Sequence, residues 1–192
     1  MRIIGGTAGG RRLQTPSRGT AKERNQRIRP TADRAREALF SIIGSQVAEA
    51  VVLDLYAGTG ALGLEALSRS ARQAVFVDSS RAALQIIGKN IALCEFADRA
   101  TVLQRDLSRG LDFLAKKLPG TVFSLVFVDP PYRKGLSERM LVELAAAGFL
   151  TAGALVVVED DAGVTLPSRV GELVLEDQRH YGDTGFWLYR LA

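Results

Sequence analysis

The stretch Val51-Val-Leu-Asp-Leu-Tyr-Ala-Gly-Thr-Gly-Ala-Leu-Gly63 joins an apolar run to three closely spaced glycines. Residues 51–55, apolar except for Asp54, predict a parallel strand covered on both faces, and residues 61–70 predict the helix that follows it. Glycines at such a junction allow a tight turn and let a ligand approach the backbone at the start of the helix. This unit predicts an open α/β sheet with a binding site at the carboxyl ends of its strands.

Strands and helices alternate along most of the remaining chain. Two strand-like runs in the tail, 172–176 and 186–189, are joined without a helix, which predicts a terminal antiparallel hairpin. The pattern as a whole predicts an α/β protein with a Rossmann-like, mostly parallel seven-stranded sheet and a C-terminal antiparallel hairpin. The other predicted strands are 74–78, 101–104, 123–128 and 154–159, and the other helices are 31–43, from about 80, 111–117 and 136–147.

Length and composition limit the class of protein. A chain of 192 residues that is 47% apolar suits one domain with a sizeable core. No apolar run approaches the length of a membrane span, and the amino terminus lacks the apolar stretch of a secretory signal. Cys94 is the single cysteine and His180 the single histidine, so the sequence predicts neither a disulfide nor a metal site. These features predict a cytoplasmic protein.

Positive charge is concentrated at the amino terminus. Residues 1–36 hold ten basic side chains and two acids, a net charge of +8, whereas the whole chain carries +4. A basic arm on a mildly acidic body indicates contact with nucleic-acid phosphates. We therefore predict a small hairpin and mobile basic loop over 1–30, before a catalytic domain over 31–192. The predicted RNA-binding residues are Arg2, Arg11, Arg12, Arg24, Arg27 and Arg29.

Three acids follow the first three predicted strands and indicate the ligand. Gly58-x-Gly60-x-x-Gly63, with Asp78 twenty residues after Gly58, also fits a dinucleotide fingerprint. Asp54 beneath this loop would repel a pyrophosphate and suits a cationic ligand. S-adenosylmethionine fits better than NAD, because Asp78 could bind the ribose hydroxyls and Asp54 the ammonium group. Asp106 could accept from the adenine amino group, with the Leu107 N–H facing the ring, although Asp106 could also be a helix-capping acid.

Asp129-Pro-Pro-Tyr132 directly follows the strand predicted at 123–128. Two successive prolines end a strand and hold the backbone rigidly at its carboxyl edge. An acid, a preset carbonyl and an aromatic ring at that edge suit the amino group of a flat base. The alternative is a strand-ending turn with a solvated acid.

Four stretches together resemble the bacterial rRNA small subunit methyltransferase D family, class I enzymes that methylate N2 of a guanine in 16S rRNA. The resemblance implies S-adenosylmethionine as cofactor, and 16S rRNA, free or within a small ribosomal subunit, as partner. It also implies a cofactor site of Asp54, Tyr56, Gly58, Gly60, Asp78, Ser79, Asp106, Leu107 and Asp129. The stretches are Met1–Gly6 with Gly10–Leu13, Arg29–Phe40, Leu53–Arg69 and Asp129–Leu136.

The predicted chemistry centres on the turn at 129–132. If the Asp129 carboxylate and the Pro130 carbonyl accept the two amino N–H bonds, the nitrogen lone pair is directed at the methyl group. Pro131 would fix this geometry, and Tyr132 would stack on a base that has left its own stack. The helix from residue 31 could bring Arg29, Thr31 or Arg34 near the cofactor.

Three alternatives remain open at this point. They are an adenine-N6 or cytosine-N4 methyltransferase, an NAD-dependent oxidoreductase and an RNA-binding module without activity. The first uses the same turn motif on the same kind of amino group, although 192 residues leave no separate target-recognition domain.

Overall fold

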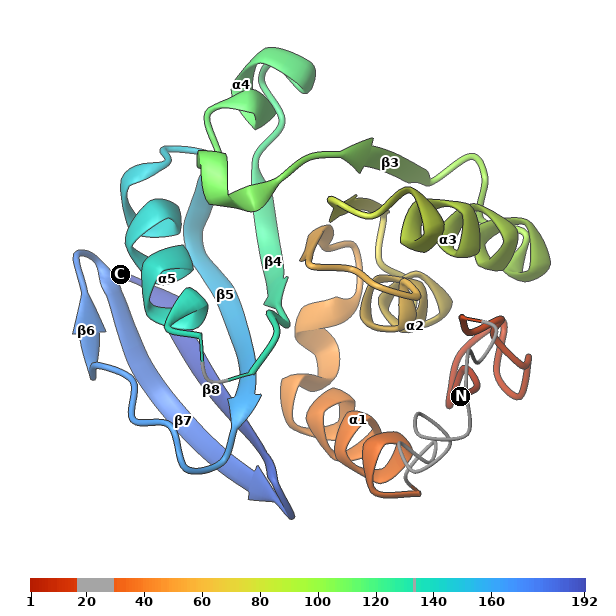
Figure 1. Ribbon diagram of the computed structural model, residues 1–192, viewed down its shortest axis with the longest axis horizontal. Helices are drawn as coiled ribbons and strands as arrows, with labels where there is room; N and C mark the ends of the chain where they lie inside the picture. The colour runs from red at the N-terminus through yellow and green to blue at the C-terminus, as the bar shows by residue number, and fades with distance from the viewer. Residues whose placement is uncertain (17–29, 133) are drawn as a thin grey trace.

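The protein is built around one mixed β-sheet (Figure 1), seen in a computed structural model that describes residues 1–16, 30–132 and 134–192. The order of its strands is β3-β2-β1-β4-β5-β8-β7-β6. Strands β1 to β5 are parallel to one another, and β8, β7 and β6 are added antiparallel. The bounds are β1 Val51–Leu55, β2 Gln73–Asp78, β3 Ala100–Gln104, β4 Phe123–Val128, β5 Leu150–Asp161, β6 Arg169–Val170, β7 Leu173–Tyr181 and β8 Thr184–Leu191.

The predicted α/β fold with its terminal hairpin is confirmed, but the predicted number of seven strands is wrong. The sheet has eight strands because β6, only two residues long, pairs with the start of β7. Two residues are too few to show any alternation of apolar and polar side chains, so no sequence pattern reports such a strand. Strands β5, β7 and β8 are also longer than predicted, because pairing extends them into their polar ends.

Helices cover both faces of the sheet (Figure 1). One core packs α1, α2 and α3 against side chains such as Val52 and Phe127, and the other packs α4 and α5 against side chains such as Leu53 and Val126. Alternate residues of one strand therefore enter different cores, which explains the continuously apolar sequence. The helices are α1 Pro30–Ile43, α2 Ala61–Ser68, α3 Arg81–Cys94, α4 Phe113–Lys117 and α5 Leu136–Ala146, with 3-10 turns η2 Gly44–Val47 and η3 Leu107–Arg109.

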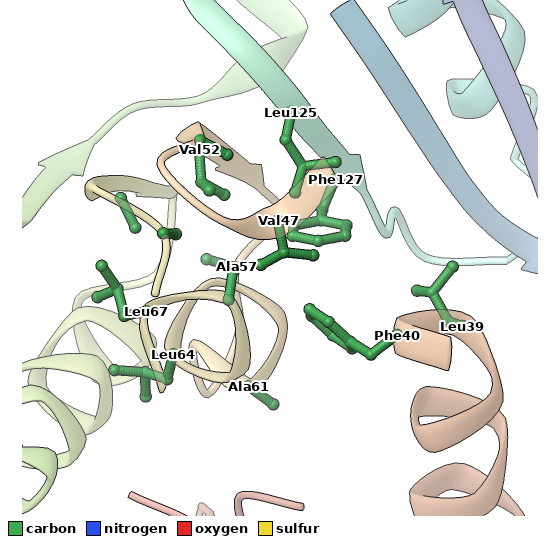
Figure 2. Close-up of a cluster of buried hydrophobic side chains, with 14 of the residues drawn as sticks. Leu39, Phe40, Val47, Val52, Ala57, Ala61, Leu64, Leu67, Leu125 and Phe127 are labelled. Carbon is green, nitrogen blue, oxygen red and sulfur yellow. The ribbon is translucent and has the colours of Figure 1, made fainter. Parts of the chain in front are cut away.

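Aromatic packing fixes α1 against the sheet. Figure 2 shows Phe40 of α1 beside Phe127 of β4, with ring centroids 5.7 Å apart. Val47 and Leu39 lie in the same cluster, and all four side chains are buried. The helix that carries the end of the basic arm is thereby held next to the carboxyl end of β4.

The first residues form the predicted small hairpin. Arg2 and Arg12 make an antiparallel bridge, and the Ile3 N–H donates to the Arg11 carbonyl at 3.0 Å. Ile3, Ala8 and Leu13 are buried in the core that contains α2. The described part of the arm is therefore packed against the body of the protein.

A buried carboxylate anchors this hairpin. Glu65 of α2 is fully buried and accepts the backbone N–H groups of Ile4 at 2.7 Å and Gly5 at 2.9 Å. Its carboxylate also pairs with the Arg69 guanidinium at 2.8 Å and lies 3.9 Å from Nε of Arg36. Glu65 thus joins the hairpin, α1 and α2 at one point.

Some predictions concern residues outside the described ranges. These are the loop over 17–29 with Arg24, Arg27 and Arg29, and the side chain of Thr31, which we expect near the cofactor. In the described ranges, no helix is both long and apolar enough to cross a bilayer.

Candidate active site

A cavity of about 140 Å³ opens where β1 and β4 end. This is the point at which the strand order reverses, since the chain runs from β1 to β2 and β3 on one side and from β4 to β5 on the other. Ligands of open α/β sheets bind at such switch points. The cavity is lined by Met1, Ala35, Arg36, Asp54, Tyr56, Ala57, Gly58, Thr59, Ala61, Leu62, Asp129, Glu159 and Phe186.

The glycine loop is shaped by the buried side chain of Asp54. Its Oδ2 accepts the Gly63 N–H at 2.9 Å, at the start of α2. Burial raises the pKa of Asp54 to about 8, against the lowering effect of this hydrogen bond. A Cβ at Gly63 would stand 2.4 Å from Cε1 of Phe76, so only glycine fits between helix and strand. Asp54 consequently reaches the cavity while holding the helix start in place.

Asp78 holds two loops by accepting backbone N–H groups. Its Oδ2 accepts from Gly58 at 2.9 Å and its Oδ1 from Ser80 at 2.8 Å. Gly58 lines the cavity, whereas the neighbouring Ser79 is exposed. The 20-residue spacing therefore has a structural basis in addition to its predicted role with ribose.

Asp106 lies outside the cavity walls. The carboxylate is exposed, and its Oδ1 accepts the Ser108 N–H at 2.9 Å, which caps the short turn η3. Hydrogen bonds from Ser108 lower the pKa of Asp106. Leu107 is buried in the core on the α4–α5 side. The structure thus brings Asp54, Tyr56, Gly58 and Asp129 together in the cavity lining. The other predicted cofactor residues do not line it: Gly60, Asp78, Ser79, Asp106 and Leu107.

The turn after β4 brings Asp129 beside the end of β1. The Asp129 N–H donates to the Leu55 carbonyl at 3.3 Å. Pro130 is buried, and Pro131 and Tyr132 are exposed. The Tyr132 hydroxyl donates to Oε1 of Glu159 at 2.8 Å and lies 3.3 Å from Oγ1 of Thr184. Burial and the adjacent Glu159 raise the pKa of Tyr132, which keeps its hydroxyl protonated.

The described cavity lining contains the carboxylates of Asp54, Asp129 and Glu159 and one basic side chain, that of Arg36. Burial, followed by the charges of Glu159 and Asp54, raises the pKa of Asp129 well above its usual range. Burial also raises the pKa of Glu159, although the Tyr132 hydrogen bond and the Arg36 charge oppose this shift. Within the described ranges, no residue donates a hydrogen bond to the Asp129 carboxylate. The site therefore offers an acceptor that receives no hydrogen bond from the described residues.

The sequence patterns missed two charged residues of this cavity. Arg36 is 5% exposed and is held by the Arg2 carbonyl and by Oδ1 of Asp33 at 3.1 Å. Its buried Nε finds no hydrogen-bond acceptor in the described part of the chain. Arg34, which we expected near the cofactor, is exposed and outside the lining, because α1 turns Arg36 inward instead. The second missed residue is Glu159 of β5, which follows Val158, the register partner of Val128, and so lies at the same sheet edge as Asp129. Its place at the end of the predicted strand 154–159 was an available signal.

The described arginines of the hairpin differ in their surroundings. Arg2 and Arg12 are exposed and border a second hollow of about 550 Å³, which shares Met1 with the first cavity. The Arg11 guanidinium instead pairs with Glu95 at 3.1 Å. Arg2 and Arg12 are therefore the more available to a phosphate. Among the described residues, no three His, Cys, Asp or Glu side chains are grouped to hold a metal.

The strand order, the glycine loop after β1 and the turn after β4 define the class I S-adenosylmethionine-dependent methyltransferase fold. The family described as "Conserved hypothetical protein 95" matches residues 1–190. The chain is 39% identical over 190 residues to ribosomal RNA small subunit methyltransferase D of Escherichia coli, covering 99% of this chain and 89% of that protein. It is 30% identical to the protein of the same name from Haemophilus influenzae, covering 100% of this chain and 92% of that one. The chain belongs to this methyltransferase family.

Solved structures agree with this assignment. A structure of an Escherichia coli protein named as a methyltransferase, yhhF, superposes with a TM-score of 0.79 at 38% identity and covers 100% of this chain and 97% of that one. An RNA methyltransferase from Salinibacter ruber, solved with S-adenosyl-L-homocysteine, has a TM-score of 0.61 at 18% identity and covers 84% and 93%. The second likeness concerns the fold alone.

Proposed function

We propose that the protein transfers a methyl group from S-adenosylmethionine to the exocyclic N2 of one guanine in 16S rRNA. Its family makes it an S-adenosylmethionine-dependent rRNA methyltransferase. The observation that carries the finer proposal is the Asp129 carboxylate, which lines the cavity next to the buried Pro130 and accepts no hydrogen bond from the described residues. Such an acceptor suits a substrate amine with hydrogens to donate.

The cavity fits a cationic cofactor. Asp54, Asp129 and Glu159 line it, and burial raises the pKa of each, so a positive charge among them would be stabilised. When bound, S-adenosylmethionine supplies a methyl group on a positively charged sulfur. The backbone at Gly58 and the carboxylates of Asp54 and Asp78 are the groups proposed to hold it, with Asp106 at its adenine end.

The residues of the turn would prepare the amino group. Its lone pair is delocalised into the ring, and acceptance of its two N–H bonds by Asp129 and Pro130 favours a pyramidal, nucleophilic nitrogen. These acceptors strengthen as the nitrogen becomes positive, so they stabilise the transition state more than the ground state. The proton released afterwards can pass to a carboxylate oxygen of Asp129, whose raised pKa suits it as a base.

The basic residues favour an RNA substrate. Arg2 and Arg12 border the hollow next to the cavity, where they would contact phosphates flanking the target nucleotide. The rRNA could be free or part of a small ribosomal subunit, and such a substrate places the proposed activity in the cytoplasm. Adenine N6 and cytosine N4 remain the alternative targets, because both amines suit the same turn.

The proposal is tested by mass spectrometry of nucleosides from 16S rRNA of a deletion strain. We expect one N2-methylguanosine to be lost, and to return with the wild-type gene but not with Asp129→Asn. An unchanged N2-methylguanosine content would contradict the proposal. Loss of N6-methyladenosine or N4-methylcytosine instead would support the alternative.

Cofactor affinity should increase with pH. Because burial raises the pKa of Asp54 to about 8, its carboxyl group is mostly protonated at neutral pH in the free protein. A bound cation favours the ionised form, so each unit by which binding lowers this pKa corresponds to about tenfold in affinity between low and high pH. The gain should level off above the folded pKa. Calorimetry with S-adenosylmethionine between about pH 6 and pH 9 measures this slope.

Asp54→Asn is the control for this effect. The variant should bind with a flatter pH dependence, because one linked proton has been removed. An identical slope for Asp54→Asn and wild type would show that Asp54 does not titrate with binding.

A further inference from the structure

Glu159 occupies a position at the cavity that neither the turn motif nor the glycine loop explains. It lies near the carboxyl end of β5, pairs in register with Phe186 of β8, and lines the same cavity as Asp129. The charge of Glu159 is the largest electrostatic influence on the Asp129 carboxylate. The two acids are therefore neighbours on adjacent strands, β4 and β5, at one edge of the sheet.

Only one oxygen of Glu159 is used by the described residues. Oε1 accepts the Tyr132 hydroxyl at 2.8 Å, and no described residue donates to Oε2. Burial raises the pKa of Glu159, and the donated hydroxyl and the positive charge of Arg36 oppose this shift. The side chain is thus held by Tyr132 with a second acceptor left over at the cavity.

The edge of the substrate base decides what such an acceptor can do. In guanine, the N2 amino group is flanked by N1–H, a second donor. In adenine and cytosine, the amino group is flanked by a ring nitrogen with a lone pair, which is an acceptor. A carboxylate beside the acceptor that holds the amine complements guanine, and it faces a lone pair in the other two bases.

We propose that Glu159 is a specificity-determining residue, whose free oxygen accepts N1–H of the guanine while Asp129 accepts from N2. This inference rests on the proposed function and adds a second contact to it. A base without N1–H would leave a partly buried carboxylate opposite a lone pair. Sites built to hydrogen-bond a substrate group reject analogues lacking it by large factors, and we expect at least about a hundredfold here.

The test uses 2-aminopurine, which keeps the 2-amino group of guanine but has a lone pair at N1. It is placed at the target position of rRNA made by splinted ligation, and kcat/KM is measured against the matched guanine RNA. Wild-type protein should prefer guanine by at least about a hundredfold. Glu159→Gln should reduce this preference by at least about tenfold, because its amide can donate to N1 of 2-aminopurine as well as accept from guanine.

Tyr132→Phe is the matched control, since it removes the hydroxyl that holds Glu159 and leaves the carboxylate. It should lower the preference for guanine less than Glu159→Gln does, because the carboxylate that accepts N1–H is kept. Comparison of the ratios cancels the different reactivity of the two amines. Circular dichroism and S-adenosylmethionine binding establish that each variant is folded.

Two results would overturn the inference. One is an unchanged ratio in Glu159→Gln with wild-type methylation of guanine, which would leave the proposed function intact. The other is an equal slowing of both RNAs by Glu159→Gln, which would mean that Glu159 supports catalysis without distinguishing the bases. If wild-type protein methylated neither N2 amine, the proposed function itself would fail together with the inference.

Discussion

Asp129→Ala is expected to abolish methyl transfer, with kcat reduced by at least about a thousandfold relative to wild type. The carboxylate receives no hydrogen bond from the described residues, so its proposed partner is the substrate amine. Its contacts strengthen in the transition state, and affinity for S-adenosylmethionine should therefore stay within about tenfold of wild type. Single-turnover transfer of labelled methyl to rRNA and calorimetric binding measure the two quantities separately.

Two further variants serve as controls for Asp129→Ala. Asp129→Asn keeps the shape but loses the charge and part of the acceptor capacity, so it should also be severely impaired. Asp98→Ala removes an exposed acid remote from the cavity lining and should leave kcat unchanged. Turnover at the wild-type rate by Asp129→Ala would refute the role given to this carboxylate.

Glu65→Ala has the largest expected effect on stability. Glu65 is fully buried, accepts two backbone N–H groups of the hairpin and pairs with Arg69. Its removal leaves the two N–H groups without their acceptor and takes the negative charge from beside Arg69 and Arg36. Breaking a buried pair in this way costs about 3 to 5 kcal/mol. For a chain of this size, Tm should fall by roughly 6 to 20 °C, measured by calorimetry.

Two variants serve as controls for the stability loss of Glu65→Ala. Glu65→Gln keeps the amide oxygen as an acceptor for Ile4 or Gly5 and should lose less stability than Glu65→Ala. Glu37→Ala on the exposed side of α1 should leave Tm almost unchanged. Glu65→Ala should also bind S-adenosylmethionine more weakly than wild type, since Met1 and Arg36 line the cavity and depend on this anchor. A Tm of Glu65→Ala equal to that of wild type would exclude the anchoring role of Glu65.

Much of the fold follows from local sequence. The continuously apolar β1 and β4 predicted parallel strands covered on both faces, and both lie at the centre of the sheet with helices on each side. Gly63 was placed at a strand–helix junction from the pattern alone, and Phe76 explains why no side chain fits there. Local patterns could not predict β6, because a two-residue strand is defined only by its partner.

The sequence by itself determined that an acid, two prolines and an aromatic ring stand at a strand end, after a glycine loop with an acid beneath it. These features are local, because residues adjacent in the chain keep their order and spacing in any fold. Only the tertiary structure decided that Glu159 and Arg36 join them at the cavity, whereas Asp106 caps a turn outside its walls. That arrangement depends on which strands pair and which face of α1 packs on the sheet. The strand pairing and the packing of α1 both follow from the burial of apolar side chains over the whole chain, and no short stretch of sequence contains that information.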